Sequence, residues 1–167
     1  MRVRGWALVV GDNIDTDTII PARHLHRADP SWLAEHVFED APMIRSALLS
    51  LHKPVIIIAG RGFGYGSSRE QAVLALKAAG VGAVIARSFH RIFFRNALNN
   101  GLPALEALIE EAETGAEVSV DLSTGTIFIG PKEFRAKPLP QQLLRILEAG
   151  GIKEELRRMA QRMAKRA

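Results

Sequence analysis

The sequence predicts an α/β fold organised around parallel strands. Two apolar, β-branched segments, residues 53–59 and 81–86, have the length and composition of buried strands, and a helical pattern follows each of them. The order strand, helix, strand, helix implies a right-handed parallel unit. Residues 117–122 and 126–129 alternate on either side of a Ser-Thr-Gly turn, which predicts a β-hairpin in addition.

The remaining elements are predicted from apolar periodicity and from start and stop signals. Residues 3–10 should form a strand that ends in a Gly-Asp-Asn turn. The helix after the first buried strand should begin at Ser67 or Ser68, and Ser88 should cap the next helix, which starts at Phe89. The helical patterns cover residues 30–38, 70–79, 89–99 and 138–149.

Length and composition indicate one globular domain over residues 1–150, followed by a basic amphipathic helix over residues 151–167. Hydrophobic residues make up 47% of the 167, which is ample for a core. No stretch approaches the roughly 18 consecutive apolar residues of a membrane span, and the N-terminus lacks the layout of a signal peptide. We therefore expect a cytoplasmic protein without membrane association.

The chain contains no cysteine, so on its own it can form neither a disulfide nor a metal centre held by thiolates. Its five histidines show no convincing metal-ligand spacing, and a lone His-x-His pair at positions 24 and 26 is a weak signal. No metal site is predicted within this chain.

The net charge of +4 is concentrated at the C-terminus. Residues 151–167 hold six basic residues against two glutamates, a difference of +4, so residues 1–150 are neutral. No aromatic residue interleaves this basic segment, so we expect no nucleic-acid binding. Four residues fall at helical spacing and form an apolar stripe, which should pack against this protein or a partner. They are Ile152, Leu156, Met159 and Met163.

Residues 60–70, GRGFGYGSSRE, join the most apolar strand to the clearest helix and hold the most distinctive chemistry. Glycine at every second position lets the backbone adopt positive φ and bring its N–H groups close to a bound group. Ser67 and Glu70 also fit a capping box, so one interpretation is that Ser67 simply caps the helix. Arg69 favours a binding site, because a cation at a helix N-terminus opposes the helix dipole. Amides, two hydroxyls and a guanidinium together indicate a site for a carboxylate or a phosphate.

The spacing of this loop excludes two common phosphate sites. The glycines do not fall at positions 1, 3 and 6 of the dinucleotide-binding fingerprint, and no P-loop lysine occurs between Lys53 and Lys77. An arginine fork beside two serines fits a small carboxylate at least as well as a phosphate.

Two polar segments precede the loop in the chain. Residues 15–18, DTDT, are interpreted as local turn chemistry, in which each side chain bonds nearby backbone. Residues 22–28 place two arginines and two histidines in a loop, and loops on a rigid scaffold are where specificity is usually placed. The first segment therefore predicts a turn, and the second predicts recognition.

Three segments in this order and spacing resemble one family: residues 11–21, 60–70 and 88–103. They are similar to the small subunit of 3-isopropylmalate dehydratase, to the related homoaconitase small subunits and to the swivelling domain of aconitase. The resemblance covers residues 1 to about 150. It implies a swivelling β/β/α domain, in which a small mixed sheet with flanking helices contributes one wall of an active site. It also implies a large subunit that holds a [4Fe-4S] cluster.

The family removes water from a hydroxy-polycarboxylate and adds it back at the neighbouring carbon, as in leucine biosynthesis. The resemblance implies that this chain is active only with the large subunit, in a heterodimer or heterotetramer. It makes Ser67 the catalytic base, activated by N–H donors and nearby positive charge. Substrate binding is assigned to Ser68, Arg69, Gly66 and Arg23. The specificity loop is assigned to His24, Leu25, His26 and Arg27.

The specificity loop departs from its relatives. The family often has Tyr-Leu-Val-Tyr there with an isopropyl substrate, or Tyr-Leu-Arg-Thr with a longer carboxylate chain, whereas this chain has His-Leu-His-Arg. A homoaconitase subunit, or a related malate-type dehydratase subunit, is therefore the alternative to an isopropylmalate dehydratase subunit. Two alternatives from other classes are a stand-alone anion-binding module and a basic interaction protein that acts through residues 151–167.

Overall fold

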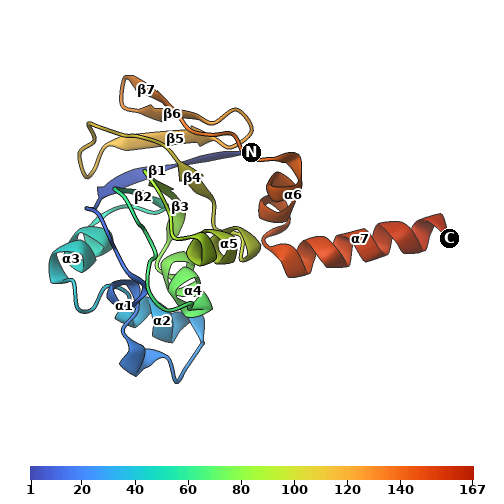
Figure 1. Ribbon diagram of the computed structural model, residues 1–167, viewed down its shortest axis with the longest axis horizontal. Coiled ribbons are helices and arrows are strands. Elements are labelled where there is room, and N and C mark those ends of the chain that lie inside the picture. The colour runs from blue at the N-terminus through green and yellow to red at the C-terminus, as the bar shows by residue number, and fades with distance from the viewer.

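The computed structural model describes residues 1–167 and contains one mixed sheet of seven strands (Figure 1). The strands lie in the order β4-β3-β2-β1-β5-β6-β7. Strands β1 to β4 run parallel to one another, and β5 to β7 continue the sheet from β1 in antiparallel pairing. Their bounds are β1 Arg2–Val9, β2 Val55–Ala59, β3 Val81–Ala86, β4 Ala104–Glu106, β5 Glu117–Asp121, β6 Thr126–Ile129 and β7 Lys132–Arg135.

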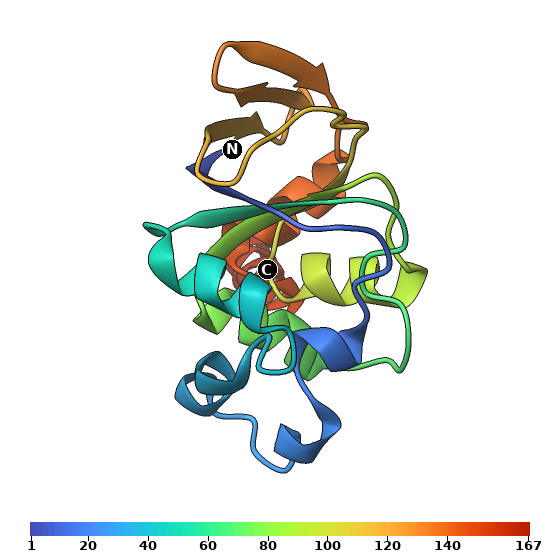
Figure 2. The same cartoon turned by 90° about the vertical axis from the view of Figure 1, so that its left-hand side faces the viewer.

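Most helices gather on one side of the sheet. Figures 1 and 2 both show α1 to α5 below the parallel strands and the antiparallel strands at the opposite end of the molecule. No helix combines the length and the apolar composition that crossing a membrane requires. The helices are α1 Thr16–Ile19, the 3-10 helix η1 Ala22–His24, α2 Pro30–His36, α3 Pro42–Ser50, α4 Glu70–Ala78, α5 Arg91–Asn99, α6 Gln141–Ala149 and α7 Ile152–Arg166.

The core is centred on β2 and β3. Ile56, Ile57 and Ile85 are fully buried, and nearly every side chain of both strands is inside. A parallel strand covered on both faces has a continuous apolar sequence, which explains why these segments show no alternation. Strand β5, in the antiparallel part of the sheet, does alternate, with Val118 and Val120 buried. The predicted α/β fold with a mixed sheet and flanking helices is confirmed.

The predicted start of α4 is wrong. The helix begins at Glu70 with Arg69 at the N-cap position, and no side chain caps it, so neither Ser67 nor Ser68 has that role. The hydroxyl of Thr16 donates to the backbone oxygen of Ser67 at 2.9 Å. This tertiary contact fixes the chain before the helix and leaves the serine side chains outside it.

The predicted start of α5 is also wrong. The helix begins at Arg91 rather than Phe89, with His90 at the N-cap position. Ser88 does not cap it, because its hydroxyl oxygen accepts the N–H of Gly62 at 2.9 Å. A contact with the loop after β2 again replaces a local cap.

Five short elements were not expected from the sequence, and two of them, α1 and η1, lie in segments predicted as a turn and a loop. Strand β4 has three residues and is ordered by its pairing with β3. Strand β7 has one apolar side chain, Phe134, and helix α3 buries only Leu48. Their local patterns are too weak to predict, since pairing and packing with neighbours determine such short elements.

Helix α7 extends away from the body of the molecule (Figure 1). It packs mainly against α6 and α5 near its start. Leu156, Met159 and Met163 remain 55%, 44% and 71% exposed. The apolar stripe of α7 therefore does not pack against this chain's own core.

Candidate functional site

The loops that follow β1, β2 and β3 meet at the carboxyl-terminal edge of the parallel strands. The N–H of Gly64 donates to the backbone oxygen of Ile14 at 2.7 Å, and the N–H of Thr16 donates to Tyr65 at 3.0 Å. In open α/β sheets, ligands bind outside this edge. Segments far apart in the sequence therefore form one continuous surface.

Two glycines allow these loops to approach each other closely. A Cβ atom at Gly60 would lie 1.8 Å from Oδ1 of Asp12. A Cβ atom at Gly64 would lie 2.2 Å from the ring of Phe93, and its φ of +83° also favours glycine. Any side chain at either position would push the loop off α5 or off the loop after β1.

The end of the loop presents unused hydrogen-bond donors. The N–H groups of Gly66, Ser67, Ser68 and Arg69 donate to no acceptor within the chain. The hydroxyls of Ser67 and Ser68 likewise have no partner, and both residues are exposed. These donors lie just before the N-terminus of α4, where the helix dipole favours a bound anion.

A shallow depression with no enclosed room for a water molecule holds these groups. His90 contributes to its wall, and the Nδ1 atom of this histidine is buried without a hydrogen-bond partner. Sites for small molecules usually measure about 300–1,000 Å³, so this depression is only part of a site. Its lining residues are Thr16, Gly64, Gly66, Ser67, Ser68, Arg69, His90, Ile92, Phe93 and Asn96.

Arg69 is paired with Asp17. Its Nη1 atom donates to the carboxylate of Asp17 at 3.1 Å and to the backbone oxygen of Ile20 at 3.3 Å, and the arginine side chain is only 16% exposed. The carboxylate also accepts the N–H of Ala22 at 3.0 Å. The Arg69 guanidinium, with help from this amide, holds the pKa of Asp17 below its usual value. Asp17 thereby links the serine loop to the start of η1.

The interpretation of residues 15–18 as local turn chemistry is partly wrong. It holds for Asp15, which caps α1 by accepting the N–H of Thr18. Thr16 and Asp17 instead bind the loop after β2, through Ser67 and Arg69. Turn-forming residues and tertiary ligands have the same composition, so the sequence alone does not separate them.

Arg23 is held by two carboxylates. Its two terminal nitrogens bind both oxygens of Asp40, at 2.9 and 2.7 Å, and one of them also binds Glu39 at 2.8 Å. Hydrogen bonds to Arg23 keep the pKa of Asp40 below its usual value. The guanidinium fork, expected to be free for substrate, is therefore occupied within the chain.

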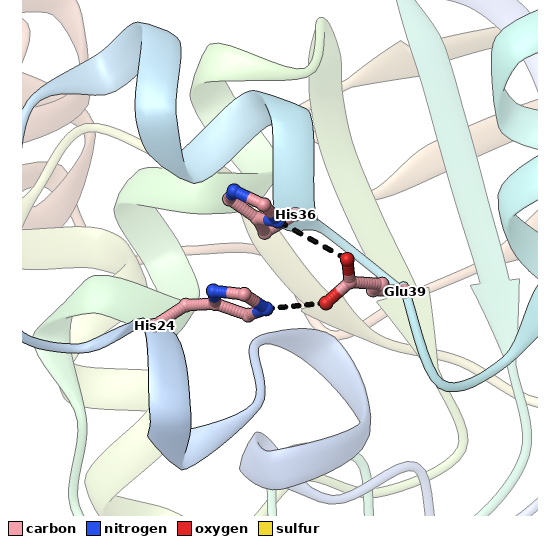
Figure 3. A group of neighbouring side chains, drawn as sticks. All are labelled: His24, His36 and Glu39. Atoms are coloured by element: carbon pink, nitrogen blue, oxygen red, sulfur yellow. Dashed lines mark hydrogen bonds and ion pairs between the residues drawn. The ribbon is translucent and has the colours of Figure 1, made fainter.

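His24, His36 and Glu39 form a compact group beside Arg23 (Figure 3). The two rings stack with centroids 3.8 Å apart and planes 14° from parallel. Glu39 binds Nε2 of His24 with one oxygen and Nδ1 of His36, at 3.2 Å, with the other. These contacts, the one to His24 first, lower the pKa of Glu39.

These three side chains have the donor types that a metal ion needs. Stacked rings direct their in-plane lone pairs side by side, however, and a metal requires ligands that converge on one point. The carboxylate of Glu39 also forms an ion pair with the Arg23 guanidinium. The geometry fits a carboxylate shared by His24, His36 and Arg23, which fastens η1 to the end of α2.

The rest of the predicted specificity loop wraps around Trp32 of α2. The indole N–H donates to the backbone oxygen of His24 at 3.0 Å, and the ring of His26 packs against its edge. The Arg27 guanidinium lies 4.5 Å from the ring centre and binds both oxygens of Asp29 at 2.9 Å. Leu25 is half-buried. The predicted loop residues are thus brought together, although none of them lines the depression at Ser67.

A larger open hollow of about 510 Å³ lies elsewhere, between residues 110–113 and 129–132. Three glutamates line it: Glu110, Glu111 and Glu113. Their charge opposes binding of a carboxylate or a phosphate. The smaller depression carries the unused donors and the guanidinium, so we place the candidate site there.

Three neighbours of the site are absent from the sequence-based prediction. Asp17 and Glu39 act as partners of predicted site residues, and His90 lines the depression with an unpaired nitrogen. The only available signal for Asp17 and His90 is that they lie within the segments 11–21 and 88–103. Nothing in the local sequence distinguishes Glu39.

Comparison with known proteins agrees with this geometry. Residues 35–109 match the family described as the aconitase C-terminal domain. The chain is 50% identical over 161 residues to the 3-isopropylmalate dehydratase small subunit of Saccharolobus islandicus, covering 95% of this chain and 96% of the relative. It belongs to this family of dehydratase small subunits.

Other members of the family support the same assignment. The 3-isopropylmalate dehydratase small subunit of Thermodesulfovibrio yellowstonii is 50% identical over 159 residues, covering 92% of this chain and 93% of the relative. The crystal structure of 3-isopropylmalate dehydratase from Methanocaldococcus jannaschii superposes with a TM-score of 0.89 at 38% identity, covering both chains completely. The predicted family and the predicted fold class are confirmed.

Proposed function

We propose that this chain is the small subunit of a hydro-lyase that interconverts 2-isopropylmalate and 3-isopropylmalate by dehydration and rehydration. The observation that carries the proposal is the unpartnered hydroxyl of Ser67 among free amides, one residue away from Ser68 and two from Arg69. The names of the relatives support the same substrate.

Ser67 is the catalytic base in this proposal. A serine hydroxyl is a weak base until its alkoxide is stabilised. Here the free N–H groups of residues 66–69, the N-terminus of α4 and the Arg69 guanidinium supply positive potential at one place. The alkoxide of Ser67 then removes the α-proton of the substrate.

Substrate carboxylates bind to Ser68, Arg69 and the amide of Gly66. Arg69 uses one terminal nitrogen for Asp17 and Ile20, so its other nitrogens are available to a carboxylate. Arg23 contributes through its Nε–H, since Asp40 and Glu39 hold both of its terminal nitrogens.

The loop geometry favours an isopropyl group over a longer carboxylate chain. A substrate such as homoaconitate carries a further carboxylate that needs a free cation. Arg27 is committed to Asp29 and Trp32, and the terminal nitrogens of Arg23 are also occupied. The loop therefore offers no free guanidinium fork for the extra carboxylate of a homoaconitase substrate, which argues against that alternative.

The other half of the site comes from a large subunit in this proposal. Dehydration requires stabilisation of a departing hydroxide, which a [4Fe-4S] cluster on the large subunit supplies as a Lewis acid. This chain has no cysteine to hold such a cluster, and its depression is small. The chain provides one wall, and the partner closes over Ser67.

Reconstitution tests the proposal. The purified chain alone should be folded, colourless and inactive, and adding the anaerobically prepared large subunit should produce turnover of 2-isopropylmalate in preference to homoaconitate. Exposing the large subunit to oxygen should abolish that turnover. Dehydratase activity of this chain alone, without iron, would contradict the proposal, and so would tight anion binding that the large subunit does not change.

Glu39 is predicted to position the specificity loop. We expect Glu39→Gln to raise KM for 2-isopropylmalate, with a loss in kcat/KM of up to about 100-fold, because small misplacements of binding groups are costly. The kcat at saturating substrate should stay close to wild type, since Glu39 lies outside the depression at Ser67. Glu35→Gln makes the same change on the exposed face of α2 and should have no effect.

Glu39→Gln should also change how the stability of the fold depends on pH in the acid range. His24, His36 and Arg23 lower the pKa of Glu39 in the fold below its ordinary value of 4.5. The stabilisation from Glu39 is therefore complete above about pH 4.5 and is lost as the pH falls through the lowered value. Glu39→Gln should lose stability less steeply on acidification than wild type, as measured by denaturation between pH 6 and 3 (roughly the span over which carboxylates titrate). An equal slope in both proteins, with an unchanged KM, would contradict the role.

A further inference from the structure

Helix α7 presents an apolar stripe that stays largely exposed beyond the half-buried Ile152. Leu156, Met159 and Met163 lie along one face, and the helix extends clear of the body in Figure 1. Isolated apolar side chains are ordinary on a surface, but a contiguous row on a projecting helix indicates a contact site. Arg162 and Arg166 border this row and form a shallow groove with the two methionines.

The charge of α7 defines the chemistry of its partner. The helix carries six basic residues and two glutamates, and both glutamates are already paired, Glu154 with Arg157 and Glu155 with Arg162. A second copy of α7 would bring the same surplus of cations together, which is unfavourable. A partner surface with an apolar centre and acidic edges complements both the apolar stripe and the positive charge of α7.

The side chains of the stripe favour a protein over a membrane. Helices that lie in a lipid interface use tryptophan, phenylalanine and many leucines on the apolar face. The stripe of α7 has no aromatic residue and contains two methionines, which adapt their shape to protein grooves. Recognition of an amphipathic helix in a groove uses this spacing of anchors.

The position of α7 relates it to the candidate active site. Asn96 of α5 lines the depression at Ser67 and also lines a second hollow that includes Ile152 and Lys153. The first turn of α7 is therefore next to the face that holds the site. From there the helix reaches about 22 Å, at 1.5 Å per residue.

We propose that α7 is a docking helix that inserts into a groove on the dehydratase large subunit. The groove has an apolar base and acidic edges, and it lies next to the site that the large subunit closes. This inference rests on the proposed function and adds the surface through which the two subunits recognise each other. The stripe supplies the anchors, and Arg166, unlike Arg162 with its Glu155 partner, is free to pair with a carboxylate at the rim of the groove.

Substitutions on the two faces of α7 test the proposal. Met159→Glu places a carboxylate on the stripe, and Gln161→Glu places the same group on the opposite face of the same helix. We expect Met159→Glu to weaken the Kd for the purified large subunit by about tenfold or more, as for a buried interface anchor, and Gln161→Glu to leave it unchanged. At saturating large subunit, kcat should match wild type, because α7 contributes nothing to the depression at Ser67. Arg166→Glu should weaken the Kd and reduce its salt dependence.

The outcomes separate this inference from the proposed function. Wild-type assembly and activity with equal Kd values for both glutamate variants would overturn the docking role and leave the function intact. Self-association of the wild type that Met159→Glu abolishes would overturn it in favour of a second copy. Binding to vesicles of phosphatidylserine that Met159→Glu abolishes would overturn it in favour of a membrane. Failure of the wild type to assemble at all would contradict the proposed function itself.

Discussion

Replacing Ser67 with alanine should lower kcat of the assembled enzyme by about 10²–10⁴-fold, the usual contribution of a general base. The fold should be unaffected, because the Ser67 hydroxyl makes no hydrogen bond within the chain and does not cap α4. A helix cap would cost about 1 kcal/mol of stability on removal, so thermal unfolding separates the two roles. Ser123→Ala, at an exposed turn between β5 and β6, is the matched control for both measurements.

The opposite result for Ser67→Ala would be informative. A variant that turns over substrate normally would remove Ser67 from the chemistry, whatever its stability. His90, which lines the same depression and has a buried Nδ1 atom without a partner, would then be the next residue to substitute.

Replacing Arg69 with lysine should reduce kcat/KM by about 10- to 100-fold, as expected when a charge-assisted hydrogen bond of about 1.5–3 kcal/mol is lost. Lysine keeps the positive charge and can still pair with Asp17, so the melting temperature should stay near wild type. Lysine lacks the planar guanidinium fork of arginine. In wild type, one nitrogen of that fork binds Asp17 and the others are free to bind a substrate carboxylate. Arg61→Lys makes the same change at an exposed position of the same loop and should have no effect.

A double-mutant cycle with Asp17→Asn locates the role of Arg69. If the only function of Arg69 is its ion pair with Asp17, Arg69→Lys will leave kcat/KM unchanged, because lysine keeps that pair. If Arg69 binds substrate, kcat/KM will fall in Arg69→Lys whether position 17 holds aspartate or asparagine.

The sequence predicts the framework of this fold because its central strands are buried on both faces. Residues such as Ile56 and Ile85 leave no interpretation other than an interior segment, and the glycines around residue 64 require a tight loop after the first of these strands. Weak elements are a different matter. Strand β4 and helix α3 depend on neighbours that are distant in sequence, and the local residue pattern gives no information about those neighbours.

The same limit applies to the candidate site. The Ser-Ser-Arg group could be predicted because its chemistry lies within three consecutive residues. Its surroundings could not, because Asp17 reaches Arg69 across 52 positions and Glu39 reaches Arg23 across 16. Local patterns also favoured caps at Ser67 and Ser88, and in both places tertiary hydrogen bonds hold the chain in another conformation. Arg69 opposes the dipole of α4, and its ion pair with Asp17 accounts for part of the reason that a cation stands there.

The small size of the depression at Ser67 has a consequence for gene dosage. The depression is too shallow to enclose a ligand, so it should not bind a metabolite tightly without a second wall. We therefore expect a surplus of this chain over its proposed partner to bind little of the hydroxy-acid pool of a cell. On that expectation, expression of the two polypeptides would not have to be matched closely, because only the assembled pair would withdraw substrate from solution.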